Sequence, residues 1–153
     1  MINLQLILAV AAGGALGSVA RYLVGIGSTR LFGVSFPWGT LIINIAGSFL
    51  IGVFVEMFAL KWDLPQTARV FLTVGICGGF TTFSTFSLDS YVLIERGEFG
   101  LAAAYIVGSG VLSIAALAGG LHHIRAAVKI QPASRARRTP LNCQRADDGK
   151  KLR

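Results

Sequence analysis

The chain has 153 residues, of which 54% are hydrophobic and only 14% are charged. A soluble domain of this length would need far more polar surface, so the composition excludes an ordinary soluble globular protein. Residues 1–128 hold six Lys/Arg against five Asp/Glu, whereas residues 129–153 hold eight against two. The net charge of +7 therefore belongs mainly to the C-terminal tail, and it predicts no nucleic-acid partner for the folded part.

Four segments are long and apolar enough to cross a hydrocarbon core about 30 Å thick, which needs roughly 20 helical residues. They cover residues 4–26, 38–60, 68–95 and 99–125. The polar connections at 27–37, 61–67 and 95–98 are short, as expected between antiparallel neighbours. These patterns predict an all-α, multi-pass protein of the cell inner membrane.

The tail after the fourth segment has a different composition. Residues 129–153 are basic and lack apolar periodicity, which predicts disorder. The predicted organisation is therefore one transmembrane domain over residues 1–128, with four helices per subunit, followed by this tail.

The third segment is interrupted by the sequence GICGGFTTFSTF, from Gly75 to Phe86. It places three glycines, four hydroxyl side chains and three phenylalanines where a continuous membrane helix would otherwise run. Unpaired backbone groups are costly in hydrocarbon, so a break is tolerated only where protein, water or an ion supplies partners. The sequence predicts a helix broken inside the bilayer, at an ion or substrate site.

Side chains near this break offer protons and aromatic edges. Phe83 and Phe86 are three residues apart and lie on one helical face, a spacing that core packing also produces. The edge of an aromatic ring carries the positive part of its quadrupole and suits an anion. The hydroxyl donors of the same segment are Thr81, Thr82, Ser84 and Thr85. Together these groups favour a small anion over a cation.

Few other polar side chains fall within the predicted spans. Asn44 lies in the second span, either as a pore-lining amide or as a hydrogen-bonding contact between helices. Tyr105, Ser109 and Ser113 are spaced by four residues and share one face of the fourth span. Serine hydroxyls in membrane helices often bond to the carbonyl four residues earlier, so this face is either a polar track or a set of self-satisfied hydroxyls.

Small residues predict close helix contacts. Gly13 and Gly17 form a GxxxG spacing in the first span, and Gly47 and Gly52 leave a groove on the second. Packing inside one subunit and a seam between two subunits both explain this pattern.

Charge counting tests the orientation of the chain. Both termini and the 61–67 loop lie on one side, with four cations near the membrane: Lys61, Arg69, Arg125 and Lys129. The other side has three: Arg21, Arg30 and Arg96. So small a bias permits insertion in either orientation and favours an antiparallel homodimer.

No acidic residue, lysine or histidine occupies the middle of a predicted span, and Asp89 sits late in the third. Proton-coupled transporters usually need an ionisable group near mid-membrane. No HExxH, GxSxG or phosphate-binding loop is present, so we do not expect an enzyme.

Over residues 5–128 the chain resembles the Fluc (CrcB) family of small dual-topology fluoride channels. The resemblance rests on GGALGSVARY (13–22), WGTLIINIAGSFLIG (38–52) and GICGGFTTFSTFS (75–87), in that order. It implies an antiparallel homodimer with two separate pores that passively export fluoride. The protein's partners would then be fluoride, a second copy of the chain and membrane lipid.

The resemblance also implies roles for individual residues. Phe83 and Phe86 match pore-lining phenylalanines, and Asn44 matches a pore-lining amide. Arg21 matches an arginine at the end of the first helix, near a vestibule. The fourth-helix polar track would be Tyr105, Ser109 and Ser113. The backbone carbonyls of Gly78 and Thr81, from both subunits, would hold a structural sodium ion.

Two other functions remain open from the sequence. A small dual-topology antiporter would share the length and weak charge bias, but it should carry a mid-membrane acid. A non-transporting membrane scaffold would share the glycine-rich helices and could use the basic tail to bind anionic lipid. The scaffold hypothesis gives no reason for a broken third helix.

Overall fold

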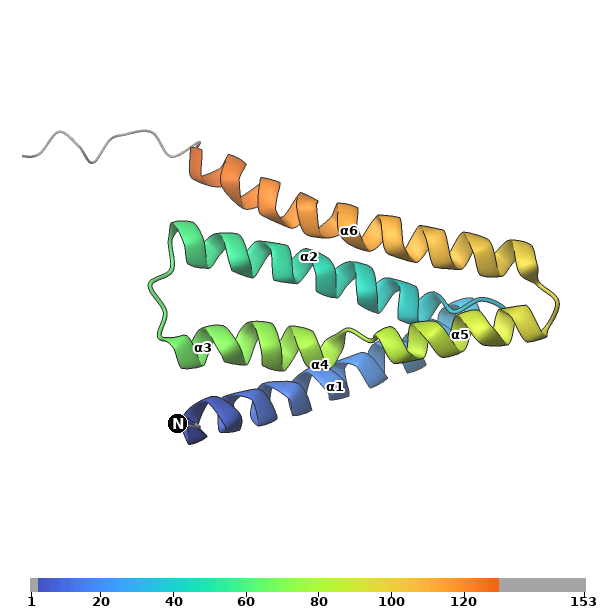
Figure 1. The fold of residues 1–153 in the computed structure, drawn as a ribbon, viewed down its shortest axis with the longest axis horizontal. Helices are drawn as coiled ribbons and strands as arrows, with labels where there is room; N and C mark the ends of the chain where they lie inside the picture. Colours follow the sequence, from blue (N-terminus) through green and yellow to red (C-terminus); the bar gives the residue numbers. More distant parts are fainter. Residues whose placement is uncertain (1–2, 130–153) are drawn as a thin grey trace, which may run out of the picture.

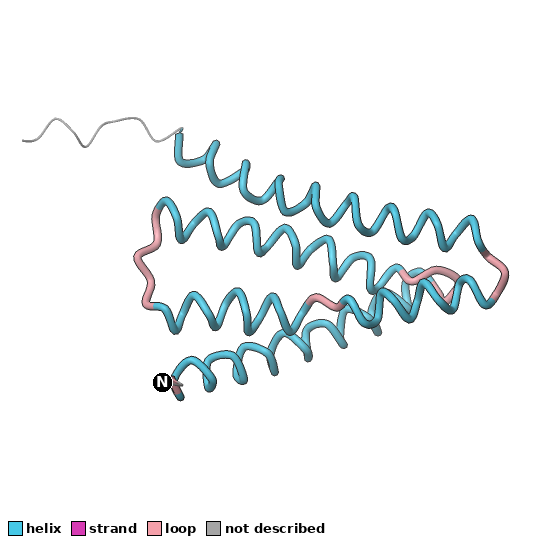
Figure 2. Tube along the Cα trace, in the orientation of Figure 1, coloured by secondary structure: helices cyan, strands magenta, loops and turns pink. Residues whose placement is uncertain are grey.

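The computed structural model describes residues 3–129 and consists there of helices joined by short connections (Figures 1 and 2). The elements are α1 (Leu4–Phe32), α2 (Trp38–Leu60), α3 (Gln66–Val70), the π-helical segment η1 (Phe71–Cys77), α4 (Gly78–Phe80), α5 (Phe83–Glu95) and α6 (Phe99–Lys129). Four stretches are long and apolar enough to span a membrane: α1, α2, the series from α3 to α5, and α6.

These stretches confirm the predicted all-α architecture, and the chain is a multi-pass membrane protein. The predicted disorder of the tail falls on residues 130–153, which lie outside the described residues. The second span has the bounds that the sequence predicts, with Trp38 at its first residue.

The first helix is longer than the sequence predicts. The polar residues after Ile26 suggest a loop, but α1 continues to Phe32, and within it the Thr29 hydroxyl is satisfied by the Gly25 carbonyl at 3.0 Å. Gly33 ends the helix instead: its φ of 77° lies in the left-handed region, and its amide caps the Thr29 carbonyl. Consequently, Arg21 is not at the helix end but about 16 Å before it.

The helices pack in two main pairs. α2 and α6 make the most extensive contact and run in the same direction, side by side in Figure 1. α1 packs against η1 and α4, the part of the third span that precedes its break. α5 follows the break and contacts α6, where Leu93, Ala102 and Tyr105 form a small buried cluster. The break therefore separates the part of the third span that packs against α1 from the part that contacts α6 (Figure 2).

Glycines allow the close approach of α1 to the third span. A Cβ at Gly13 would lie 2.6 Å from the Phe71 carbonyl oxygen, and a Cβ at Gly17 would meet the Ile76 carbonyl oxygen. A Cβ at Gly79 would lie 2.6 Å from the Gly14 oxygen. The GxxxG pattern thus serves packing within one subunit, one of the two explanations that the sequence leaves open.

Replacing Gly17 with alanine should destabilise the protein. The added methyl group would be forced against backbone atoms, which cannot rotate away, and overpacking of this kind costs about 1–3 kcal/mol. Thermal unfolding in detergent measures the effect. Gly14→Ala is the matched control on the same helix, because a Cβ there meets nothing within 4 Å. Equal unfolding temperatures for the two variants would contradict this account of the α1 contact.

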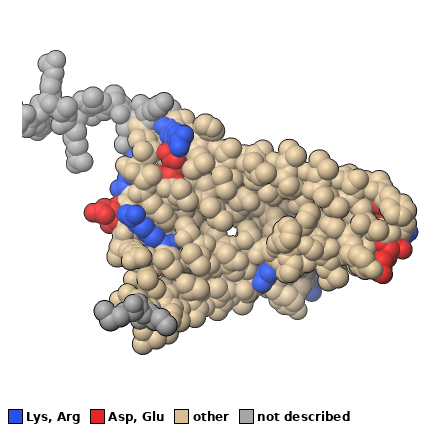
Figure 3. Space-filling model, in the orientation of Figure 1, with Lys and Arg blue, Asp and Glu red and all other residues tan. Residues whose placement is uncertain are grey.

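Most of the charged side chains visible in Figure 3 lie toward the two ends of the bundle. At one end Glu56, which is buried, accepts a hydrogen bond from the Arg125 Nε at 2.8 Å and joins α2 to α6. Near it, Arg69 lies 3.9 Å from Asp63. The long middle of the face shown in Figure 3 has few charged side chains, as expected of a membrane-spanning body.

Candidate functional site

The break in the third span is held open by Asn44 of α2. Thr81 and Thr82 have extended backbone between α4 and α5. The Asn44 Nδ2 donates to the Thr82 carbonyl at 3.1 Å, and the Thr82 amide donates to the Asn44 Oδ1 at 2.9 Å. One amide side chain therefore satisfies both backbone groups of Thr82. The break predicted from the sequence is confirmed, and protein supplies the partners that it needs.

A cluster of hydroxyls begins α5. The Thr82 side chain caps the helix by accepting from the Thr85 amide at 3.3 Å. Its oxygen also lies 3.2 Å from the Ser84 Oγ and donates to the Thr85 Oγ1 at 3.1 Å. Thr82 is buried, whereas Ser84 and Thr85 are exposed on the subunit surface. This cluster places exposed hydroxyl groups at membrane depth, where lipid offers no hydrogen-bond partner.

Two backbone carbonyls at the break lose their usual helical donors. In a continuous helix the Thr82 amide would reach the Gly78 carbonyl and the Thr85 amide would reach the Thr81 carbonyl. Here the first amide bonds to Asn44 and the second to the Thr82 hydroxyl. Gly78 is exposed, and a Cβ there would have only the Thr73 oxygen, at 3.8 Å, as a neighbour within 4 Å. The two carbonyls are the ones for which the sequence predicts a cation.

Most of the predicted site residues line one groove of about 350 Å³ between α2, the break and α6. The predicted residues in its wall are Asn44, Thr82, Phe83, Phe86, Ser109 and Ser113, together with Thr81. They come from three separate spans, so the groove exists only in the folded subunit. Ser84, Arg21, Tyr105 and Gly78 do not line it.

The two phenylalanines touch but differ in exposure. Their ring centroids are 5.5 Å apart, with the planes inclined by 40°. Phe86 packs against Tyr105 at 5.3 Å and belongs to the edge of the buried cluster. Phe83 is 78% exposed, although it lies at the level of the break. The pair therefore forms a wall of the groove whose outer side is open in a single subunit.

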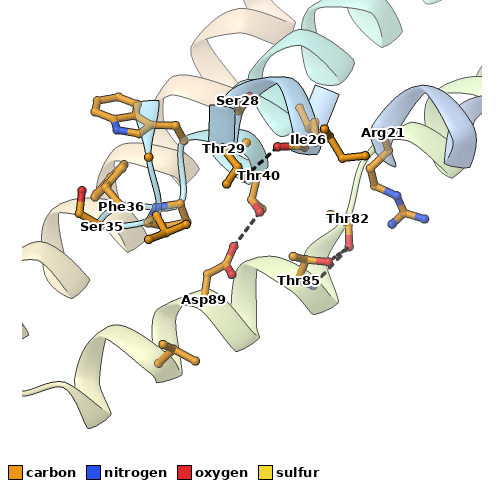
Figure 4. Close-up of a pocket in the computed structure, with 18 of the residues that line it drawn as sticks. Arg21, Ile26, Ser28, Thr29, Ser35, Phe36, Thr40, Thr82, Thr85 and Asp89 are labelled. Atoms are coloured by element: carbon orange, nitrogen blue, oxygen red, sulfur yellow. Dashed lines mark hydrogen bonds between the residues drawn. The ribbon is translucent and has the colours of Figure 1, made fainter. Parts of the chain in front are cut away.

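Tyr105 lines neither the groove nor a second, larger cavity, unlike Ser109 and Ser113. Its ring is buried, and its hydroxyl donates to the Asp89 Oδ2 at 3.3 Å. Thr40 donates to the same oxygen at 2.6 Å (Figure 4). The predicted track on the fourth span thus divides: two serines line the groove, and the tyrosine helps to bind a carboxylate. Asp89 was not among the predicted site residues; the signal that could have found it is its position one helical turn after Thr85.

That carboxylate lines a larger cavity of about 660 Å³, open between the end of α1, the start of α2 and α5. Arg21, Thr85 and Asp89 are among its lining residues. Figure 4 shows Asp89 pointing toward Thr40, with Arg21 on the other side of Thr82. Thr82 lines both cavities, so it lies between the larger cavity and the groove.

Arg21 has a second connection to the break. Its Nη2 donates to the Ser18 Oγ at 3.4 Å, and that oxygen lies 3.5 Å from the Gly79 carbonyl. The arginine is half-buried in α1 and lines the larger cavity. Its place near a vestibule stays a prediction, whereas its predicted place at the helix end is wrong, because α1 continues to Phe32.

The serines of the groove differ from the other hydroxyls in the spans. Five hydroxyls donate to the carbonyl four residues earlier: Thr29, Thr73, Thr81, Ser87 and Ser90. Within residues 3–129, neither Ser109 nor Ser113 makes such a bond, and the buried Ser113 Oγ has no partner. The groove also contains Ser48, which the sequence interpretation omits although it follows Asn44 by four residues.

Comparison with known proteins places this geometry in a family. Residues 8–121 match the family model described as "CrcB-like protein, Camphor Resistance (CrcB)". A protein of Nitrobacter winogradskyi named "Fluoride-specific ion channel FluC" is 67% identical over 119 residues, which cover 78% of this chain and 94% of that protein.

Two further relatives carry the same name. The protein of Agrobacterium fabrum is 58% identical over 79% of this chain and 94% of its own length. That of Rhodospirillum centenum is 51% identical over 82% of this chain and 99% of its own length. The matched region contains the second and third spans whole and most of the first and fourth, together with the break, the groove and the larger cavity. The chain belongs to the CrcB family.

Proposed function

We propose that this protein is a fluoride-selective channel that passively exports fluoride across the membrane. The observation that carries the proposal is the groove at the broken third span, which collects an amide, hydroxyls and two aromatic rings without a charged side chain. Two relatives, each matched over 94% of its own length, are named fluoride-specific ion channels, which supports the same conclusion.

The chemistry of the groove suits fluoride. Fluoride is small and strongly hydrated, so a selective path must replace its water with closely spaced donors. Asn44, Ser109 and Ser113 can offer N–H or O–H groups, and the rings of Phe83 and Phe86 can offer their positive edges. None of these groups carries a full positive charge that would hold the anion too tightly to release it.

The larger cavity would serve as the entrance. It is lined by Arg21, whose positive charge attracts an anion toward Thr82, the residue shared by both cavities. From there the ion would pass into the groove. Asp89 also lines this entrance, and its carboxylate accepts hydrogen bonds from Thr40 and Tyr105.

We further propose an antiparallel homodimer with two pores. Phe83, Ser84 and Gly78 are exposed on the subunit at membrane depth, where a second protein surface would complete the wall and satisfy the hydroxyl. The small difference in positive charge between the two ends permits both orientations.

A structural sodium ion at the dimer centre fits the residues present. The Gly78 and Thr81 carbonyls have lost the amides that a continuous helix would provide, and carbonyl oxygens are suitable ligands for a hard cation. When bound, sodium would offset the partial negative charge of these oxygens. The ion stays outside the anion path in this proposal, because Gly78 does not line the groove.

A flux measurement tests the channel directly. The purified full-length protein is reconstituted in liposomes loaded with potassium fluoride, valinomycin is added, and an electrode follows external fluoride. Liposomes loaded with potassium chloride run in parallel. We expect rapid fluoride release and negligible chloride release. Folded protein that releases no fluoride, or releases both anions equally, would overturn the proposal.

Removing residues 130–153 should leave fluoride release within about twofold of the full chain. The tail lies beyond the residues that match the family, and the groove is built entirely from residues 44–114. The same liposome assay measures this, with equal amounts of folded protein. Loss of function on truncation is the result that a lipid-binding scaffold would give.

A further inference from the structure

We propose that Ser48 is a further fluoride-coordinating residue. Together with Ser113 it forms a second pair of hydrogen-bond donors in the groove. The first pair is Asn44 and Ser109. This inference rests on the proposed channel function and deepens it. Ser48 belongs to α2, is half-buried, and lines the same groove as the other three residues.

The helix geometry places the second pair of donors one turn after the first pair. Ser48 follows Asn44 by four residues on α2, and Ser113 follows Ser109 by four residues on α6. Each interval is about 6 Å along a helix and returns to nearly the same face. Because α2 and α6 pack together and run in the same direction, both intervals lead away from the larger cavity. An ion leaving the first pair of donors would meet the second pair next.

The hydroxyls of the second pair, Ser48 and Ser113, can donate a hydrogen bond to an ion. Ser113 Oγ is buried without a hydrogen-bond partner among the described residues. No hydrogen bond joins the Ser48 hydroxyl to any other residue in the same part of the chain. By contrast, Ser90 is satisfied by the Phe86 carbonyl at 2.7 Å. An unpaired hydroxyl at membrane depth costs free energy, and a passing anion would relieve that cost.

Helices α2 and α6 come into close backbone contact one turn beyond Ser48. A Cβ at Gly52 would meet the Leu117 carbonyl oxygen, so α2 and α6 touch there through their backbones. Ile51 and Ile114 supply the remaining apolar wall. Ser48 and Ser113 are therefore the last polar side chains of the groove at this end, where the ion most needs a substitute for water.

The test compares three variants of the full-length chain in the fluoride liposome assay. Ser48→Ala removes the hydroxyl and should slow fluoride release at least about tenfold, because a hydrogen bond to a charged group is involved. Ser48→Thr keeps a hydroxyl and should retain most of the rate. Ser90→Ala is the matched control, since that serine is buried, self-satisfied and absent from both cavities.

A second readout separates coordination from packing. The initial rate is measured over a range of fluoride concentrations, and Ser48→Ala should raise the half-saturating concentration while its unfolding temperature and dimer elution match those of Ser90→Ala. Equal rates for Ser48→Ala and Ser90→Ala would overturn the proposal. It would also be overturned if Ser48→Thr were as slow as Ser48→Ala, or if Ser48→Ala failed to fold as a dimer. A wild-type chain that releases no fluoride would instead overturn the channel function itself.

Discussion

Replacing Phe83 or Phe86 with isoleucine should slow fluoride release by about tenfold or more. Isoleucine preserves apolar bulk but has no ring edge to face an anion. The quadrupole contributes about 0.5–1.5 kcal/mol to a contact between two aromatic rings, and a loss of that size at a barrier slows transport up to about tenfold. The altered wall shape adds to this, because both rings line the groove and touch each other at 5.5 Å.

The matched control is Phe54→Ile on α2. Phe54 stacks on Phe58 at 6.1 Å and lines neither cavity, so the same change of side chain there should leave fluoride release intact. Size-exclusion elution should show unchanged assembly for all three variants. Wild-type flux in both the Phe83 and Phe86 variants would remove the two rings from the ion path.

Replacing Asn44 with aspartate should be more damaging than any other single change in the groove. The carboxylate cannot donate to the Thr82 carbonyl, so one of the two hydrogen bonds between residue 44 and Thr82 is lost. It also places a negative charge beside the proposed path. Two like charges 4 Å apart repel by about 4 kcal/mol at an effective dielectric constant of about 20, which corresponds to about a thousandfold in rate.

Asn44→Ala separates the loss of the hydrogen bonds from the effect of the charge, since it removes both hydrogen bonds to Thr82 without adding a negative charge. We expect both variants to unfold at a lower temperature than the wild type, because the backbone groups of Thr82 lose their partners. Fluoride release should be slower in the aspartate variant than in the alanine variant. Similar fluxes in the two would show that Asn44 acts only on the backbone, and normal flux in the aspartate variant would place the residue away from the path.

The weak point of the sequence interpretation was the first helix. Gly27, Ser28 and Thr29 are common in loops, but no proline follows until Pro37, and a hydroxyl can bond within its own helix. Helix ends depend on such local choices, which composition alone does not resolve. The correction matters for function, because the extension of α1 forms one wall of the larger cavity, which Arg21 also lines.

The hydroxyls of the fourth span illustrate a second limit. Helical spacing correctly puts Tyr105, Ser109 and Ser113 on nearly one face. It cannot say which neighbouring helix each one meets. In the fold the tyrosine reaches Asp89 of α5, whereas the serines turn toward α2 and the break. Ser48 was missed for the same reason, since a lone serine in an apolar helix has meaning only beside its neighbours.

The sequence by itself determined the four spans, the break in the third, and the polar and aromatic residues gathered near it. These are local properties: apolar length fixes a membrane helix, and glycines with hydroxyl side chains interrupt one. Only the tertiary structure decided that Asn44 pairs with Thr82 across the break, that the glycines of α1 pack inside the subunit, and that Thr82 lines two cavities. Contacts between helices depend on how their surfaces fit, and that fit is shared among residues far apart in the chain.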